Sequence, residues 1–244
     1  MKKKIIPLLI ASMILSGLPV EALGAVSFSD INNVPWEGAK TYIQTVADAG
    51  LMTGYLENGK YTFKAKNNVT YCESIQLVYN VLQKNNSLKS TSSYVSKWVN
   101  VMNGYKIPSW AHTAVSYALE NGIVSISDLV KFMSGSSSNY ATREDVSIFF
   151  GKALGTITST SASNTLTFND ASKISAAAPP YVKLMVSMGI LSGDDNNNFN
   201  PATKINRAEI AVIIMGMNTK TAELAKGNAQ TGSTLRGTVI ARED

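Results

Sequence analysis

Three segments of this sequence repeat one local pattern, in which a helix-capping residue is followed three residues later by an acidic residue and then by an apolar helical stripe. The cap and acid pairs are Thr70 with Glu73, Thr142 with Asp145, and Asn206 with Glu209. Asn206 and Glu209 can form a capping box, and the other two pairs show the same order of cap and acidic residue. The stripes that follow are Ile75, Val78, Tyr79 and Leu82; Val146, Phe149, Phe150, Ala153 and Leu154; and Ile210, Ile213, Ile214 and Met217. An internal repeat constrains the fold strongly, because a short unit cannot bury its apolar face alone.

Each repeated unit also contains a pattern that predicts a first helix, which precedes the capped helix. The predicted units begin at Phe28-Ser29-Asp30, Trp98-Val99-Asn100 and Phe168-Asn169-Asp170, whose last residues are 70 positions apart. Helical stripes follow at Ala39, Ile43 and Val46; at Ala111, Ala114, Val115, Ala118 and Leu119; and at Tyr181, Leu184, Met185 and Met188. A proline precedes each helix, at Pro35, Pro108 and Pro180, and a glycine ends each, at Gly50, Gly122 and Gly189. We therefore expect an all-α fold of three helix-loop-helix repeats that share one core.

These repeats divide the chain into five segments. We predict a signal peptide at 1–25, repeats at 26–84, 98–155 and 166–218, and a linker or tail at 219–244. The connectors 83–97 and 155–167 are rich in Ser, Thr and Asn and read as flexible surface linkers, which could also hold short helical turns. In the tail, residues 227–232 resemble a linker and residues 235–240 alternate like the start of a strand. A truncated cargo domain and a disordered C-terminus both remain open.

The N-terminus predicts export from the cytoplasm. Lys2, Lys3 and Lys4 precede an apolar run from Ile5 to Leu18, and Ala22, Gly24 and Ala25 offer cleavage positions. No other apolar run approaches the roughly 20 residues that span a membrane, so we expect no membrane insertion of the mature chain. The formal net charge of +5 becomes +3 once three lysines and Glu21 are removed. That mild excess is compatible with an anionic partner and equally with a solvated surface.

Arg207 is the residue in the third repeat that folding alone does not explain. It lies between the cap Asn206 and Glu209, where a cation faces the positive end of the helix dipole at a cost of a few tenths of a kcal/mol. An anionic ligand would favour an arginine there, because free helix amides and a guanidinium together bind carboxylate or phosphate. The sequence therefore predicts an anion site at this helix start.

Other functional classes find little support. The lone His112 has no paired nucleophile, the carboxylates show no spacing typical of a glycosidase, and no cofactor or phosphate-loop motif occurs, so we expect no enzyme and no cofactor. The loop from Asp194 to Asn200 has Phe199 where a calcium loop needs glycine, so we read it as a polar turn and expect no metal. Basic residues are scattered, which disfavours nucleic acid. Cys72, the one cysteine, reads as core filler.

The ordered motifs resemble the S-layer homology (SLH) repeat. The third unit shows them most fully, as Phe168-x-Asp170, Tyr181, Gly189-Ile190-x-x-Gly193, Phe199-x-Pro201 and Asn206-Arg207-Ala208-Glu209. The resemblance covers roughly residues 28–217. It implies a pseudo-threefold helical domain with grooves between neighbouring units. It also implies non-covalent anchoring of an exported protein at the bacterial cell surface, through an anionic secondary polysaccharide linked to peptidoglycan and often carrying a pyruvate ketal.

Several residues are candidates for that ligand. The arginines of the repeated motif, Arg207 and Arg143, would hold a carboxylate, and we rank Arg207 first because the third repeat departs least from the pattern. Other candidates are the aromatic residues Trp36, Trp110 and Tyr181, the aspartates Asp30 and Asp170, and the motif glycines Gly54 and Gly193. The tryptophans are also explained as core residues and the aspartates as turn caps. Tyr71 replaces the arginine in the first repeat, so that unit should bind a carboxylate poorly.

Two further roles remain open beside anchoring. The chain could be a structural subunit that self-associates in a surface lattice, although the three repeats without a large assembly domain favour anchoring. A surface hydrolase lacking its catalytic part is a weaker alternative. Sedimentation with wall sacculi would separate anchoring from lattice assembly.

Overall fold

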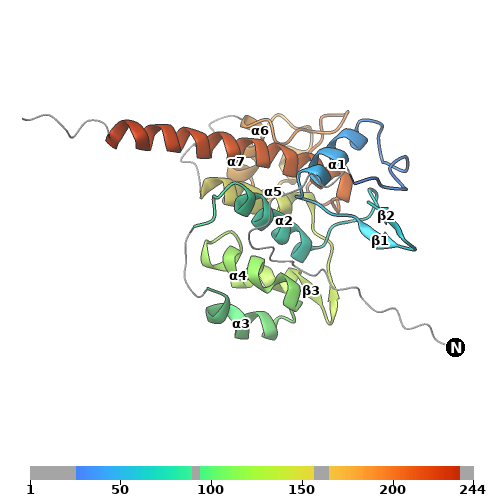
Figure 1. The fold of residues 1–244 in the computed structure, drawn as a ribbon, viewed down its shortest axis with the longest axis horizontal. Helices are drawn as coiled ribbons and strands as arrows, with labels where there is room; N and C mark the ends of the chain where they lie inside the picture. The colour runs from blue at the N-terminus through green and yellow to red at the C-terminus, as the bar shows by residue number, and fades with distance from the viewer. Residues whose placement is uncertain (1–25, 90–93, 157–164, 237–244) are drawn as a thin grey trace, which may run out of the picture.

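The computed structural model describes residues 26–89, 94–156 and 165–236, with side chains up to Lys226. The predicted signal peptide at 1–25 and the strand-like part of the tail beyond residue 236 lie outside the described residues. The described part of the chain is mostly helical, as the apolar stripes predict (Figure 1).

The structure contains seven α-helices, three short 3-10 turns and two short β-hairpins in the described residues. In chain order they are α1 (Ala39–Asp48), α2 (Tyr71–Lys84), α3 (Tyr94–Gly104), α4 (His112–Glu120), α5 (Arg143–Gly155), α6 (Pro179–Ser187) and α7 (Arg207–Arg236), with short 3-10 turns η1 (Ser109–Ala111), η2 (Ile126–Lys131) and η3 (Ala171–Lys173). The hairpins pair β1 (Tyr55–Glu57) with β2 (Lys60–Thr62) and β3 (Met133–Ser134) with β4 (Ser137–Ser138). These hairpins were not predicted.

The three predicted N-caps are confirmed at the starts of α2, α5 and α7. Thr70 Oγ1 accepts the Glu73 amide at 3.2 Å, and Asn206 Oδ1 accepts the Glu209 amide at 2.9 Å. Each glutamate returns the bond by accepting the amide of its own cap at 2.8 Å. The apolar stripes behind these caps are buried, apart from the half-buried Tyr79. Local sequence therefore decides where the three helices begin and which face of each enters the core.

The residues just before the three caps join the repeats in a closed cycle of backbone hydrogen bonds. The Val69 amide donates to the Ile205 carbonyl at 2.9 Å, the Ile205 amide to Ala141 at 3.2 Å, and the Ala141 amide to Val69 at 2.8 Å. All three residues are buried, so an unpaired amide or carbonyl here would be costly. The cycle ties the starts of α2, α5 and α7 together.

The first helix of each repeat packs against the second helix of another repeat. α1 packs on α7, α4 on α2 and α6 on α5. The predicted buried positions on α1 and α4 are confirmed, and the predicted glycine stops have positive φ angles of 67°, 66° and 69° at Gly50, Gly122 and Gly189. Each repeat thus buries its apolar faces mainly against its neighbours.

The prediction for residues 94–100 is wrong. Residues 94–97, assigned to a linker, and Trp98-Val99-Asn100, assigned to a unit start, instead form the helix α3, which packs on α4. Trp98 Nε1 donates to Glu120 Oε2 at 2.9 Å, which fixes α3 to the end of α4. The helix has its own signal that the motif search overlooked, because Tyr94, Trp98 and Met102 recur at four-residue spacing.

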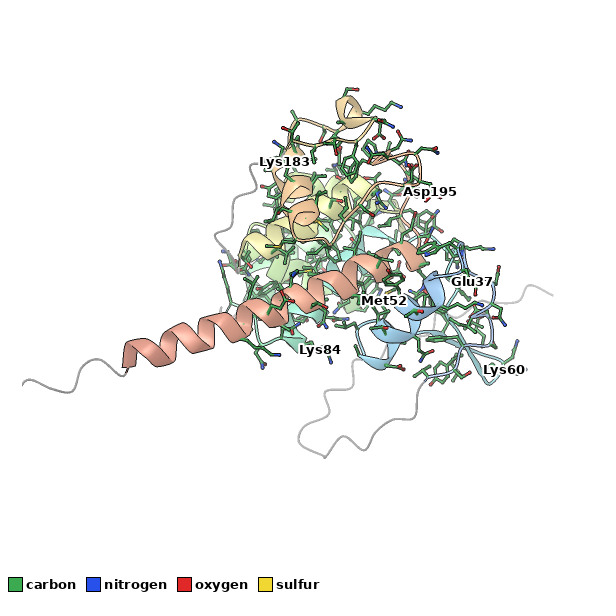
Figure 2. All side chains as sticks on the ribbon, turned by 90° about the horizontal axis from the view of Figure 1, so that it is seen from above. Glu37, Met52, Lys60, Lys84, Lys183 and Asp195 are labelled. Carbon is green, nitrogen blue, oxygen red and sulfur yellow. The ribbon has the colours of Figure 1, made fainter. Side chains whose placement is uncertain are left out.

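The predicted linker within the tail is also wrong, because α7 continues as one helix through Arg236. Figure 1 shows its C-terminal part projecting beyond the other helices. In Figure 2, Lys84 at the end of α2 lies beside α7. The side chain of the next residue, Asn85, donates from Nδ2 to Asn218 Oδ1 of α7 at 2.9 Å. The strong helix formers in 222–226 continue the helix past that contact.

Gly151 allows α6 to lie directly against α5. A Cβ atom at Gly151 would lie 2.5 Å from Tyr181 Cβ and 3.0 Å from Tyr181 Cα, so α6 would have to move. We expect Gly151→Ala to lower stability by about 1–3 kcal/mol, despite the better helix propensity of alanine. Gly155→Ala is the matched control in the same helix, since nothing lies within 4 Å of its Cβ. Thermal melts that shift equally for both variants would contradict this account of the α5–α6 contact.

Candidate functional site

Two grooves lie where segments of three different repeats meet. The first, which we name the Arg207 groove, encloses about 310 Å³. The second, the Arg143 groove, encloses about 500 Å³. Both volumes are within the range of small-ligand sites in proteins. Two grooves of related composition at two junctions are the strongest candidate sites in the described part of the chain.

The Arg207 groove combines four features. Arg207 enters from the start of α7, the loop 50–55 follows α1, Glu73 comes from the start of α2, and Trp110 comes from η1. Met52, in the same loop, lies beside the N-terminal part of α7 in Figure 2. The groove therefore receives side chains from all three predicted repeats.

The Arg143 groove has the same combination, shifted by one repeat. Arg143 enters from the start of α5, the loop 190–195 follows α6, Glu209 comes from the start of α7, and Trp36 precedes α1. Trp36 and Trp110 are each 38% exposed, so each has part of its ring available to a ligand. An exposed indole face beside an arginine and a carboxylate suits a sugar that carries an acid group.

The expected anion site made of free helix amides is wrong. The amides of Arg207 and Ala208 donate to the carbonyls of Asn67 and Ala65, at 2.9 and 3.0 Å. The amides of Arg143 and Glu144 likewise donate to Thr203 and Pro201, at 2.8 and 3.0 Å. The turn of a neighbouring repeat thus caps each helix start, and ligand recognition falls to side chains.

The predicted site residues separate into two groups. Arg207, Gly54 and Trp110 line one groove, and Arg143, Gly193 and Trp36 line the other. Asp30, Asp170 and Tyr181 line neither. The structure thus brings together six of the nine predicted residues, three in each groove.

The glycines that line the grooves have a structural reason to lack a side chain. A Cβ at Gly54 would lie 2.5 Å from the Phe28 ring and 2.6 Å from the Thr62 carbonyl. A Cβ at Gly193 would lie 3.2 Å from Asn197 backbone atoms. Because these glycines have no side chain, the loops 50–55 and 190–195 can pack closely against other residues of their own repeats.

The two aspartates support the loops behind the grooves. Asp30 accepts the amides of Phe63 and Lys64 at 2.7 and 2.8 Å, and Asp170 accepts those of Phe199 and Asn200 at the same distances. Lys64 and Asn200 have positive φ angles of 57° and 58°. Each carboxylate therefore holds a left-handed backbone position that few non-glycine residues adopt.

Tyr181 acts in packing. Its backbone and Cβ lie against Gly151 on α5, and the Lys152 ammonium lies 5.8 Å from the centre of its ring.

Glu73 and Glu209 are groove residues that sequence reasoning assigned only to capping. In each, Oε2 is used by the cap, while Oε1 has no hydrogen-bond partner among the described residues. Both glutamates line a groove, so each can accept a ligand hydroxyl through the remaining oxygen. The signal that marks them is their fixed position in the capping box, three residues after the cap.

A third inter-repeat contact lacks an arginine, as predicted. Tyr71 takes its place and stacks on Phe132 with ring centres 5.2 Å apart. Its hydroxyl donates to Asp145 Oδ2 at 2.6 Å, and Lys131 Nζ lies 2.8 Å from Asp145 Oδ1. Burial raises the pKa of Asp145, but hydrogen bonds from Lys131, Tyr71 and Thr142 outweigh burial and leave that pKa below its usual value. This junction is closed by the protein's own ion pair.

The remaining reactive side chains have structural partners. Burial, aided by the nearby Glu73 charge, raises the pKa of the Cys72 thiol to about 12, so it stays protonated in the core. His112 Nε2 lies 3.0 Å from the Ile107 carbonyl. Asp194 Oδ1 accepts the amides of Asn196 and Asn198, as in a polar turn. Within residues 26–89, 94–156 and 165–236, no three His, Cys, Asp or Glu side chains gather as a metal site.

A sequence model of the S-layer homology domain matches residues 27–73 and 167–211. These segments contain the loops and capping glutamates of the two grooves. The chain thus contains two segments that match the S-layer homology family, together 92 of its 244 residues. The SLH match does not include the middle repeat, whose arginine nevertheless enters one groove.

Two relatives extend the SLH comparison. Over 216 residues, which are 87% of this chain and 18% of the relative, the sequence is 28% identical to the exoglucanase XynX of Acetivibrio thermocellus. Over 45 residues, 18% of this chain and 4% of the relative, it is 49% identical to the surface-layer 125 kDa protein of Lysinibacillus sphaericus. The chain thus spans less than a fifth of either relative. Among the described helices, none combines the length and apolar character needed to cross a bilayer.

Proposed function

We propose that this protein anchors an exported polypeptide to the bacterial cell wall without a covalent bond, by binding an anionic secondary wall polysaccharide. The observation that carries the proposal is the Arg143 groove, in which an arginine, the capping Glu209 and the half-exposed Trp36 meet from three repeats. The SLH match and the similarity to a surface-layer protein and to an exoglucanase support attachment at the cell surface.

The architecture that we propose for this role has three SLH repeats, at 26–84, 98–155 and 166–218, related by a pseudo-threefold axis. The cyclic backbone bonds among Val69, Ala141 and Ile205 and the cyclic packing of first on second helices support that arrangement. The middle repeat differs by its added helix α3 and by Tyr71 at its junction with the first repeat.

The ligand that we propose bears a compact carboxylate, such as a pyruvate ketal on a sugar ring. A guanidinium can hold such a group by paired charge-assisted hydrogen bonds, the indole covers an apolar sugar face, and the glutamate accepts a hydroxyl. The protein is not an enzyme in this proposal, because the arginine, glutamate and tryptophan of the groove are each assigned to binding and none to a chemical step. We place it at the cell surface.

A role as a self-assembling lattice subunit is the second candidate. The similarity to the surface-layer protein covers only 45 residues, 18% of this chain and 4% of that protein, which argues for attachment more than for assembly.

Sedimentation with purified wall sacculi tests the anchoring proposal. We expect the protein to pellet with intact sacculi, and its bound fraction to fall about tenfold after mild acid removes the polysaccharide, because charge-assisted contacts dominate such a site. Lys183→Ala, outside both grooves, is the control for general electrostatic attraction. Equal pelleting with stripped sacculi would overturn the proposal, and ordered assembly without sacculi would favour the lattice role.

A further inference from the structure

The guanidinium of Arg207 makes three hydrogen bonds within the protein itself. Its Nε donates to the Phe63 carbonyl at 2.8 Å, an NH2 hydrogen goes to the Thr53 carbonyl at 2.7 Å, and NH1 lies 3.4 Å from the Tyr55 hydroxyl. The rings of Phe63 and Tyr55 lie 4.6 and 4.9 Å from the guanidinium carbon. Only 8% of the residue is exposed. The edge formed by Nε and NH2, one of the two that can pair with a carboxylate, is therefore occupied by two carbonyl oxygens.

Those contacts connect distant parts of the chain. Phe63 and Thr53 precede Arg207 by 144 and 154 residues, so the side chain joins the start of α7 to the loop of the first repeat. Withdrawing the guanidinium to meet a ligand would leave two carbonyls without their donors, which opposes such a movement.

Arg143 occupies the equivalent position but is less engaged. It donates from NH2 to the Ser192 carbonyl at 2.7 Å, and its guanidinium carbon lies 5.7 Å from the Phe199 ring. Its Nε is buried and has no hydrogen-bond partner. A buried donor without a partner costs free energy, so a ligand acceptor that reached this Nε would remove that cost.

The surroundings of Arg143 match a recognition role. It lines the larger groove together with Trp36, which is half-exposed. Burial lowers the pKa of Arg143, while the carboxylates of Glu209, Asp194 and Asp170 oppose that effect, so the side chain remains cationic.

We infer that the two arginines have different tasks: Arg143 binds the acid group of the ligand, and Arg207 clasps the first repeat to the third. The inference rests on the proposed function for its Arg143 half. It reverses the ranking that the sequence motif predicts, because the motif shows only that both arginines follow a cap and not how many partners each already has.

Matched lysine variants test this division, because lysine keeps the charge but cannot bond two acceptors with one planar group. For Arg207→Lys we expect the melting temperature to fall by about 5 °C or more, with affinity for a pyruvylated wall saccharide within about twofold at a temperature where both proteins are folded. For Arg143→Lys we expect the melting temperature to change by less than about 2 °C, and the affinity to fall about tenfold. Calorimetric titration and thermal melts supply both readouts.

Each outcome bears on the inference. Failure of Arg207→Lys to fold would support the clasp, and loss of affinity in that variant without a change in melting temperature would overturn it. Unchanged affinity in Arg143→Lys, with a wild-type protein that binds, would overturn the recognition half alone. A wild-type protein that binds no acidic saccharide would instead refute the proposed function, while the difference in melting temperature would still test the clasp.

Discussion

A chain from Val26 to Thr165, which lacks the third repeat, is expected to show no cooperative thermal transition. The truncation removes α7, against which α1 packs, and α6, which covers α5. It also removes Ile205, so the Val69 amide and the Ala141 carbonyl lose their partners in the backbone cycle. Thr53 and Phe63 lose the Arg207 guanidinium as well. Losses of several kcal/mol each would together exceed the roughly 5–15 kcal/mol by which domains are stable.

The matched control is a chain from Val26 to Lys226, which keeps every residue whose side chain the structure describes and removes the last turns of α7. We expect its melting temperature to lie within about 2 °C of the full chain, because every residue of the buried core described above is kept. Circular dichroism melts of the two truncated chains provide the comparison. If the shorter chain melted sharply near the temperature of the full chain, the repeats would be autonomous units and the shared core described here would be wrong.

Local signals predicted most of the helical framework. The stripes behind Thr70, Thr142 and Asn206 were readable because a helix repeats its apolar face every three to four residues, and because a cap is a property of a few adjacent residues. The glycines that end the first helices, Gly50, Gly122 and Gly189, could also be predicted, because a left-handed helix stop depends on adjacent residues only. The β1–β2 turn had an equally local signal, since Asn58-Gly59 with φ angles of 50° and 75° forms a tight hairpin turn.

The candidate site was less predictable because its contacts join different repeats. Arg207 and Trp110 were both identified from sequence, but no local pattern shows that they line one groove with the loop 50–55. The occupation of the helix amides by Asn67, Ala65, Thr203 and Pro201 was equally hidden, since those carbonyls come from other repeats. The same long-range contacts explain why identical motif positions, Arg143 and Arg207, differ in their number of partners.

The role of Asp170 was left between ligand binding and turn capping, and the structure gives it two backbone amides behind the groove. Asp170→Ala should therefore destabilise the chain by about 3–5 kcal/mol and lower the melting temperature by about 10 °C, because two buried amides lose a charged acceptor. Asp170→Asn keeps one acceptor oxygen and should lose about half as much. Asp195→Ala, an exposed residue at the rim of the Arg143 groove, is the control for removing a nearby charge.

The same carboxylate should make stability depend on pH in a defined direction. Burial raises the pKa of Asp170, but the hydrogen bonds from the Phe199 and Asn200 amides outweigh burial and hold that pKa below its usual value. The folded state therefore binds this proton more weakly than the unfolded state, whose aspartates titrate near about pH 3.9. The contribution of Asp170 is complete above that pH and is lost as the pH falls through the lower folded pKa. Urea midpoints measured from pH 7 down to about pH 3 should decline more steeply for the native sequence than for Asp170→Ala. If the urea midpoints of the two proteins declined in parallel, the Asp170 carboxylate would not be the acceptor that holds the loop at Phe199 and Asn200.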